Sequence, residues 1–204
     1  MESKIDKRYI NMIRQIVRNN KFKNWLNITY RFDKGLFFHG VRVSYYSYLV
    51  GKELRLSDKK MKNLIIGSLF HDIGKIFIPK EIVFKEGKLT DEEYEIMRKH
   101  VIYGYKIANP PSSKPIFKKQ VSQIILLHHE KYDGTGYPKG IKGKKTNLLV
   151  QIVHFADIYD ALRSRRTYKP SFSKEKTSSI MKTTGKIEHS TKVLKSAKRA
   201  NLIL

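Results

Sequence analysis

The sequence predicts an all-α protein, a helical bundle in which side chains from several helices converge on one site. Apolar residues recur at helical spacing in successive segments, and glycine- and proline-rich stretches separate these segments. Strand patterns are scarce, and no internal repeat is found. Most of the histidines lie on the expected helices or at their ends, which is how a bundle builds a metal site.

The expected helices follow from apolar periodicity and from capping residues. They cover residues 4–20, 36–54, 58–74, 91–108, 117–129 and 148–162, and two short helices are expected after Pro170. Ser57 is expected to cap the third helix, and Thr90 with Glu93 forms a capping box for the fourth. Asn24, Asn27 and the stretch 33–35 weaken the pattern, so residues 21–35 are expected to be less regular.

Composition limits the compartment and the chemistry. No apolar run approaches the roughly 18 residues that a membrane span needs, and the first residues do not resemble a secretory signal, so we expect a cytoplasmic protein without a membrane span. The chain has no cysteine, which excludes disulfides and thiolate metal sites. Any metal must therefore bind His, Asp and Glu, a donor set compatible with Fe, Mn, Zn or Ni.

The chain is strongly basic, with 42 Lys and Arg against 18 Asp and Glu and a net charge of +24. A polyanionic partner such as a nucleotide or nucleic acid is one explanation, and lysines spread over every solvated face are the other. The local excess is clearest in residues 161–204, which hold 12 basic and 2 acidic residues. This stretch is the better candidate for a docking surface.

The histidines form the pattern that indicates chemistry. A single buried histidine is usually a structural polar residue, but here two pairs, His71-Asp72 and His128-His129, both lie at expected helix ends. His39, His100 and Asp157 lie on three further expected helices. Such a set can bind two metal ions with one bridging carboxylate, about 4 Å apart, an arrangement that suits phosphate ester hydrolysis.

Three motifs carry a family resemblance. Residues 71–75 read HDIGK, residues 128–138 read HHEKYDGTGYP, and residues 156–162 read ADIYDAL. Together they resemble the HD-GYP subfamily of the HD superfamily of metal-dependent phosphohydrolases, over roughly residues 38–169. The resemblance implies an HD-domain helical bundle with a dinuclear metal site.

The resemblance also implies roles for individual residues. The implied metal ligands are His39, His71, Asp72 and Asp157 for one ion and His100, His128 and His129 for the other, with Asp72 bridging. Asp72 and Lys75 are the implied catalytic residues, and Lys75, Arg166 and Lys169 the implied phosphate contacts. Gly136, Tyr137 and Pro138 are expected to shape a loop over the site and to contact a partner protein. The cofactors are two divalent ions, with Fe or Mn preferred and Zn, Ni or Mg compatible.

Two departures from the family pattern bear on these expectations. Some members hold a third ion through a glutamate one helical turn before the first histidine, but Gly35 is found there, so two ions are expected. After residue 162 the chain reads RSRRTY, with extra arginines at Arg163 and Arg165. They either attract phosphate at the mouth of the site or belong to a solvent-facing turn.

Other chemically distinctive residues receive structural interpretations. His189 is expected at the surface, and His154, three residues before Asp157, is expected beside the metals or in the core. Tyr45, Tyr46 and Tyr48 are expected to pack on a helix face rather than to stack on a base.

The expected organisation is an N-terminal helical segment (residues 1–30), an HD-GYP catalytic domain (31–172) and a basic, weakly helical tail (173–204). The leading hypothesis is hydrolysis of cyclic di-GMP to linear pGpG, with onward hydrolysis to GMP left open. The alternatives are a phosphohydrolase for cyclic GMP-AMP or another nucleotide, and a non-catalytic module that binds a dinucleotide or a partner. Nucleic-acid binding through the basic tail and a homodimer are further hypotheses. The first 30 residues are too short for a receiver domain, so regulation is expected from a partner, an oligomer or expression.

Overall fold

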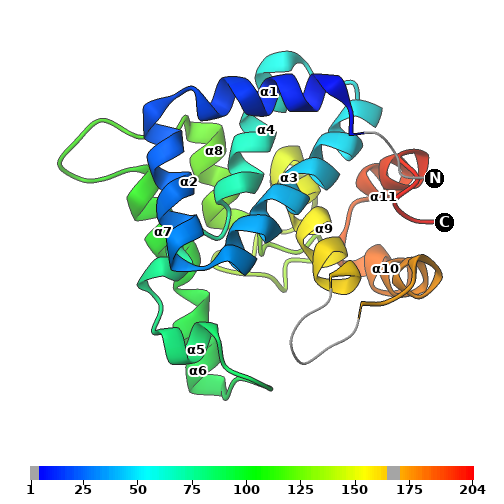
Figure 1. Cartoon of the computed structure of the whole chain (residues 1–204). Helices are drawn as coiled ribbons and strands as arrows, with labels where there is room; N and C mark the ends of the chain where they lie inside the picture. Colours follow the sequence, from blue (N-terminus) through cyan, green and yellow to red (C-terminus); the bar gives the residue numbers. More distant parts are fainter. Residues whose placement is uncertain (1–4, 165–170) are drawn as a thin grey trace.

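The computed structural model describes residues 5–164 and 171–204, without the side chains of residues 185–187. All regular elements in these ranges are helical, which confirms the all-α prediction (Figure 1). The α-helices are α1 (Lys7–Val17), α2 (Asn20–Phe32), α3 (Lys34–Glu53), α4 (Asp58–Phe70), α5 (Lys80–Val83), α6 (Asp91–Arg98), α7 (His100–Ala108), α8 (Lys119–Leu127), α9 (Leu148–Arg163), α10 (Lys174–Glu188) and α11 (Thr191–Arg199). Short 3₁₀ helices cover Ile73–Phe77 and Gly143–Lys145.

Helix α4 lies at the centre of the bundle. Its residues from Leu64 to Phe70 are all buried, and it packs against α3, α8 and α9 (Figure 1). A helix that is apolar on every side is stable only inside a core, so the other helices must surround it. Ser57 occupies the N-cap position of α4 but makes no side-chain capping hydrogen bond, so that part of the prediction is wrong.

The segment from residue 21 to 35 is more regular than expected. Residues 20–32 form α2, and a single residue, Asp33, separates α2 from α3. Asn19 caps the start of α2, and Asp33 accepts a hydrogen bond from the backbone N–H of Leu36 over 2.5 Å. Asn24 and Asn27 therefore lie within a helix, where contacts with α1 and α3 outweigh their low helix propensity.

The expected helix over residues 91–108 is divided at Lys99 into α6 and α7. The capping box of Thr90 and Glu93 is present at the start of α6, as predicted. The division makes His100 the first residue of α7, and α7 packs on α8 and on the 3₁₀ helix after α4.

The C-terminal segment was expected to be weakly helical, but it forms α10 and α11, of 15 and 9 residues. Both pack against α9, and α11 also contacts α3 (Figure 1). Met181, Val193 and Ile203 are buried there, so this segment completes the core. The proposed division at residues 30 and 172 stays a prediction.

The predicted absence of a membrane span agrees with the helices of the described chain, none of which is long and apolar enough to cross a bilayer.

Candidate metal centre

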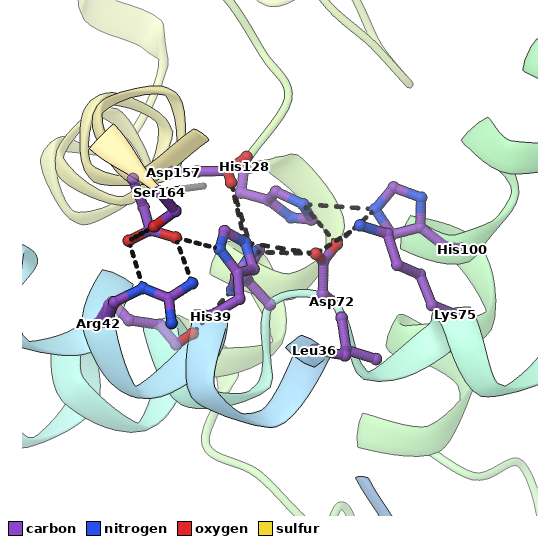
Figure 2. A network of polar contacts seen from close by, with 12 residues as sticks. Leu36, His39, Arg42, Asp72, Lys75, His100, His128, Asp157 and Ser164 are labelled. Atoms are coloured by element: carbon purple, nitrogen blue, oxygen red, sulfur yellow. Dashed lines mark hydrogen bonds and ion pairs between the residues drawn. The ribbon is translucent and has the colours of Figure 1, made fainter. Parts of the chain in front are cut away.

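The seven predicted ligands come together in the structure from five parts of the chain. His39 lies on α3, His71 and Asp72 directly follow α4, and His100 begins α7. His128 and His129 directly follow α8, and Asp157 lies on α9. Figure 2 shows most of these side chains pointing toward one another. Helix ends therefore supply most of the cluster, as the sequence indicated.

Asp72 lies at the middle of the cluster. Its Oδ1 is 3.2 Å from Nε2 of His100 and 3.7 Å from Nε2 of His128. Its Oδ2 is 3.3 Å from Nε2 of His71 and 3.6 Å from Nε2 of His39. One carboxylate thus faces two separate histidine groups, the geometry that a bridging ligand needs.

The donor atoms form two groups that could each hold an ion. One comprises His39, His71 and Asp157, and the other Asp72, His100, His128 and His129; within each group the ligand atoms lie within 4.8 Å of one another. Oδ1 of Asp157 is 3.1 Å from Nε2 of His39 and 3.8 Å from Nε2 of His71. The division into groups matches the one implied by the motifs.

Backbone carbonyls orient three of the histidines. In each case Nδ1 donates to the carbonyl three residues earlier: His71 to Ser68 over 2.7 Å, His100 to Met97 over 2.7 Å and His128 to Ile125 over 3.0 Å. With Nδ1 acting as the donor, Nε2 carries the lone pair and faces Asp72. Metal-binding histidines are commonly oriented in this way.

The electrostatics favour a cation at the centre. Burial would raise the pKa of Asp72, but the charges of Lys75 and His71 outweigh it and hold that pKa well below its usual range. Burial lowers the pKa of His128 to about 4 and that of His129 well below its ordinary value. At the second group of donor atoms, an ionised carboxylate therefore lies beside the neutral imidazoles of His128 and His129, which is the protonation state that binds a divalent ion.

Two residues that support the cluster received no role from the sequence. Oδ2 of Asp160 accepts a hydrogen bond from Nδ1 of His39 over 2.7 Å, and Arg42 donates to both oxygens of Asp160 over 2.7 and 3.0 Å. Asp160 lies three residues after Asp157, and Arg42 three after His39, so each shares a helix face with a ligand. That spacing was the available signal.

Lys75 contacts the cluster directly. Its Nζ donates to Oδ2 of Asp72 over 2.6 Å. The side chain follows the carboxylate by three residues, on the 3₁₀ helix, and lines the same cavity as the ligands. A cation is therefore present beside the cluster, as the motif implied.

Gly136, Tyr137 and Pro138 form a loop against the second group of ligands. The Tyr137 ring stacks on His129 with centroids 4.7 Å apart, and the Arg98 guanidinium lies 4.6 Å from the Tyr137 centroid. A Cβ on Gly136 would lie 2.3 Å from the carbonyl oxygen of His129, so only glycine allows this approach. The Tyr137-Pro138 peptide bond is cis.

Glu130 anchors this loop, although the sequence suggested no role for it. The side chain is 1% exposed and accepts hydrogen bonds from the backbone N–H groups of Lys139 over 2.7 Å and Ile141 over 2.9 Å. A buried carboxylate needs such partners. Its position directly after two ligands was the only signal.

Several predictions concern residues around this centre. Arg166, Lys169 and Arg165 lie outside the described residues. Nη1 of Arg163 donates to the carbonyl of Phe172 over 2.7 Å, a structural contact that links α9 to the C-terminal segment. Tyr48 is buried, and Tyr45 and Tyr46 pack against the core, as expected.

The expectations for the two remaining histidines had different outcomes. His154 is buried, and its Nδ1 donates to the carbonyl of His128 over 2.9 Å, so its predicted place beside the ligands is confirmed. The predicted surface position of His189 is wrong: the residue is 3% exposed and packs against His154 and Phe155. The packing of α10 and α11 on α9 buries it.

Four of the seven predicted ligands line a cavity of about 900 Å³. Its wall includes His39, His100, His129 and Asp157, together with Gly35, the position where a third-ion ligand would be expected. Gly35 contributes no donor side chain there.

The residues fit a metal site better than a structural polar cluster. Nε2 of His71 and Oδ1 of Asp72 are fully buried and have no hydrogen-bond partner among the described residues. Burying such atoms without partners is costly, and a divalent cation would satisfy both.

The helical fold and this donor set define an all-α metal-binding protein. The chain belongs to the HD domain family, whose model matches residues 10–190.

Curated relatives support the motif-based resemblance. The chain is 39% identical over 133 residues to the cyclic di-GMP phosphodiesterase response regulator RpfG of Xanthomonas campestris, covering 65% of this chain and 34% of the relative. It is 40% identical over 131 residues to a cyclic di-GMP phosphodiesterase of Thermotoga maritima, covering 64% and 35%. It is also 36% identical over 143 residues to the 3'3'-cGAMP-specific phosphodiesterase 3 of Vibrio cholerae, covering 70% and 30%. The chain thus spans about a third of the length of these relatives.

Solved structures agree on the fold. Bd1817, an HDG"Y"P protein from Bdellovibrio bacteriovorus, superposes with a TM-score of 0.66 at 25% identity, covering 80% of this chain and 51% of that one. The HD domain of the phosphodiesterase PgpH from L. monocytogenes, in complex with cyclic-di-AMP, gives a TM-score of 0.64 at 16% identity, covering 88% and 93%.

Proposed function

We propose that this chain hydrolyses a cyclic dinucleotide, with cyclic di-GMP as the leading substrate and linear pGpG as the first product. The observation that carries the proposal is Asp72, whose two oxygens face two histidine groups. His39 and His100 of these groups line a cavity of about 900 Å³. The similarity to cyclic di-GMP phosphodiesterases names the substrate class.

The proposed cofactor is a pair of divalent ions, Fe or Mn by preference, with Zn, Ni or Mg also compatible with the donors. His39, His71 and Asp157 would hold one ion, His100, His128 and His129 the other, and Asp72 both. A bound pair supplies Lewis acidity and makes water acidic enough to act as the nucleophile near neutral pH. The side chains of this chain would hold that pair at the wall of the cavity.

Lys75 is proposed to stabilise the extra negative charge that develops on the phosphate as the ester bond breaks. Its ammonium already lies within the cluster, at Asp72, and lines the cavity. A cation held in position before the reaction lowers the barrier more than one that must move there. Replacing Lys75 with Met should reduce kcat by about 10²–10³-fold. The bound-metal content is measured in parallel. A fall in kcat at unchanged metal content supports the proposed role of Lys75, whereas a matching loss of metal would assign Lys75 to holding Asp72.

The cavity also offers surfaces for the bases. Phe84 and Tyr94 line it and are each 46% exposed. Exposed aromatic rings bind bases by stacking, worth about 1–3 kcal/mol per base. Phe84→Ala and Tyr94→Ala should therefore raise KM more than they lower kcat. Arg166 and Lys169 stay proposed phosphate contacts, tested in the same way by alanine replacement.

Product analysis tests the proposal directly. Protein loaded with Mn²⁺ or Fe²⁺ is incubated with cyclic di-GMP, and products are separated by anion-exchange chromatography beside an Asp72→Ala variant of verified helical content. Conversion to pGpG by the native chain alone is expected, and later appearance of GMP would show a second hydrolysis. If the loaded native chain binds cyclic dinucleotides but turns none over, the non-catalytic binding module is the correct alternative.

The second candidate substrate is cyclic GMP-AMP. It is favoured by the similarity to the 3'3'-cGAMP-specific phosphodiesterase of Vibrio cholerae. Competition between the two cyclic dinucleotides in one reaction gives their kcat/KM ratio, which decides the preference.

The remaining proposals concern place and partners. A cytoplasmic location, a homodimer and a signalling partner at the Tyr137 loop are proposed from the sequence. Pro138 and the two residues that follow it, Lys139 and Gly140, are exposed there. Nucleic-acid binding through the C-terminal segment is best tested by reversing charges, because deleting the segment would remove buried residues. The exposed lysines suited to replacement by Glu are Lys182, Lys192, Lys195 and Lys198. Salt-dependent retention on DNA or RNA should disappear in that variant, and equal retention would remove the proposal.

A further inference from the structure

A third cluster of metal-binding side chains lies outside the two ligand groups around Asp72. It comprises His154 on α9, Glu188 at the end of α10 and His189 in the turn before α11. One ligand atom from each residue lies within 4.8 Å of those of the other two. The sequence did not predict this cluster, because its residues meet only through the packing of the C-terminal helices on α9.

His154 is oriented like a metal ligand. Its Nδ1 donates to the carbonyl of His128 over 2.9 Å, so the lone pair is on Nε2. That Nε2 is buried and has no hydrogen-bond partner among the residues that the structure describes. Metal-binding imidazoles commonly donate a hydrogen bond from one ring nitrogen, so that the lone pair of the other nitrogen can bind the ion.

His189 has fewer hydrogen bonds than His154. Both of its ring nitrogens are buried without a hydrogen-bond partner in the described parts of the chain. The ring packs at 5.1 Å from His154 and 5.5 Å from Phe155, centroid to centroid. Leucine or phenylalanine would fill this space without burying unpaired nitrogens, so packing alone does not account for a histidine here.

Glu188 adds the negative charge. Its Oε1 forms an ion pair with Nζ of Lys131 over 2.6 Å, and Oε2 remains for a second partner. The Lys131 charge opposes a cation at this place, whereas the carboxylate favours one. The affinity of the cluster for a cation should therefore depend on Lys131.

We propose that His154, Glu188 and His189 bind a third divalent transition-metal ion, with Zn²⁺ as the best match, separate from the ions held around Asp72. Two imidazoles and one carboxylate are a common zinc donor set, with a fourth position open to water or a ligand. Tetrahedral bonds of about 2.0–2.1 Å place donor atoms about 3.4 Å apart, so donor atoms that now lie within 4.8 Å must approach one another by at most about 1.4 Å. His154 and Glu188 also line the main cavity, so the fourth position faces it.

Such an ion would attach the junction of α10 and α11 to α9 directly beside His128. The ion would therefore stabilise the C-terminal helices against the catalytic core. This role does not depend on the substrate or on turnover.

The test counts ions in the whole chain. Purified protein is loaded with Zn²⁺, dialysed and measured by mass spectrometry, beside His189→Leu and Glu188→Gln variants whose helical content is verified. We expect three ions per native chain, two in His189→Leu, and at least tenfold weaker binding of one ion in Glu188→Gln. Equal zinc content and equal affinity in all three proteins would overturn the proposal.

A second measurement isolates the third site from the proposed catalytic one. In a His71→Ala, Asp72→Ala, His128→Ala background, added Zn²⁺ should still raise the melting temperature, and adding His189→Leu should abolish that rise. Lys131→Met in the same background should lower the zinc concentration needed for half of the effect. Turnover without a third ion would defeat this inference alone, and a third ion without turnover would defeat only the proposed function.

Discussion

Asp160 holds His39 in position through a hydrogen bond of 2.7 Å between its Oδ2 and Nδ1 of His39. Arg42 in turn holds both oxygens of Asp160, so the carboxylate has little freedom to rotate. Because Nδ1 makes this hydrogen bond, Nε2 of His39 is the nitrogen that points toward Asp72 and Asp157. Asp160 therefore acts on the candidate metal centre through another residue.

Asp160→Asn should weaken the binding of one of the two ions proposed around Asp72 by about 10–100-fold. Asparagine has a donor as well as an acceptor, so it can stabilise the wrong tautomer of His39. Competition with a chromophoric chelator measures the affinity of each ion. Arg42→Gln is the matched control, because it leaves the His39 hydrogen bond intact and should have a smaller effect; equal losses would contradict the tautomer argument.

Gly74 allows the backbone of the 3₁₀ helix after α4 to pack closely against the start of α7. A Cβ at this position would lie 1.9 Å from the carbonyl oxygen of His100 and 2.5 Å from the backbone nitrogen of Gly104. Gly74→Ala should therefore cost about 3 kcal/mol or more in the free energy of unfolding and displace His100. Denaturant titration measures the first effect and metal affinity the second.

Gly87→Ala provides the control for that variant. Gly87 has φ of +99° and no atom within 4 Å of the added Cβ, so only backbone strain of roughly 1–2 kcal/mol is expected. A Gly74→Ala protein as stable as the Gly87→Ala protein would show that α7 can move away without loss.

Local patterns predicted those parts of the structure that depend on local physics. The capping box at Thr90 and the apolar stripe of α9 both appear close to where the sequence placed them. The motif resemblance named all seven residues of the cluster, and five of them lie within the three short motifs, whereas His39 and His100 lie outside these motifs.

Contacts between distant segments account for what the sequence did not predict. The asparagines of α2 disfavour a helix locally, and neighbouring helices outweigh them. His189 reads as a surface residue because its neighbours are polar, yet α10 and α11 bury it against α9. No local signal at Asp160 or Glu130 states which histidine or which loop each one supports.

Tyr137 supports His129 from the loop side. Its ring stacks on the imidazole at 4.7 Å, and Arg98 lies 4.6 Å from the Tyr137 centroid. Tyr137→Ala should remove both contacts. It should weaken the binding of the ion proposed at His100, His128 and His129 by roughly tenfold, in keeping with about 1–2 kcal/mol for such pairs. Tyr137→Phe keeps the ring and should bind metal like the native chain; a loss as large as in the alanine variant would assign the effect to the hydroxyl.

The metal-free protein should lose stability as the pH rises from about 6.5 to 9. Burial would lower the pKa of His39, but hydrogen bonds to Asp157 and Asp160 outweigh it and raise the pKa to about 9. The unfolded pKa is about 6.5. A raised folded pKa means that the stabilisation is fully present below pH ~6.5 and disappears as the pH passes through 9.

Urea unfolding of the chelated protein at pH 6.5 and pH 9.5 measures this change, expected to be on the order of 2–3 kcal/mol. In His39→Gln the difference between the two pH values should largely disappear. His189→Leu is the control, because burial lowers the pKa of His189 to about 3 and the residue is neutral across the whole window. If the free energy of unfolding falls equally in the native protein, His39→Gln and His189→Leu, the titrating group lies elsewhere. His39 would then not be the charged residue of the metal-free centre.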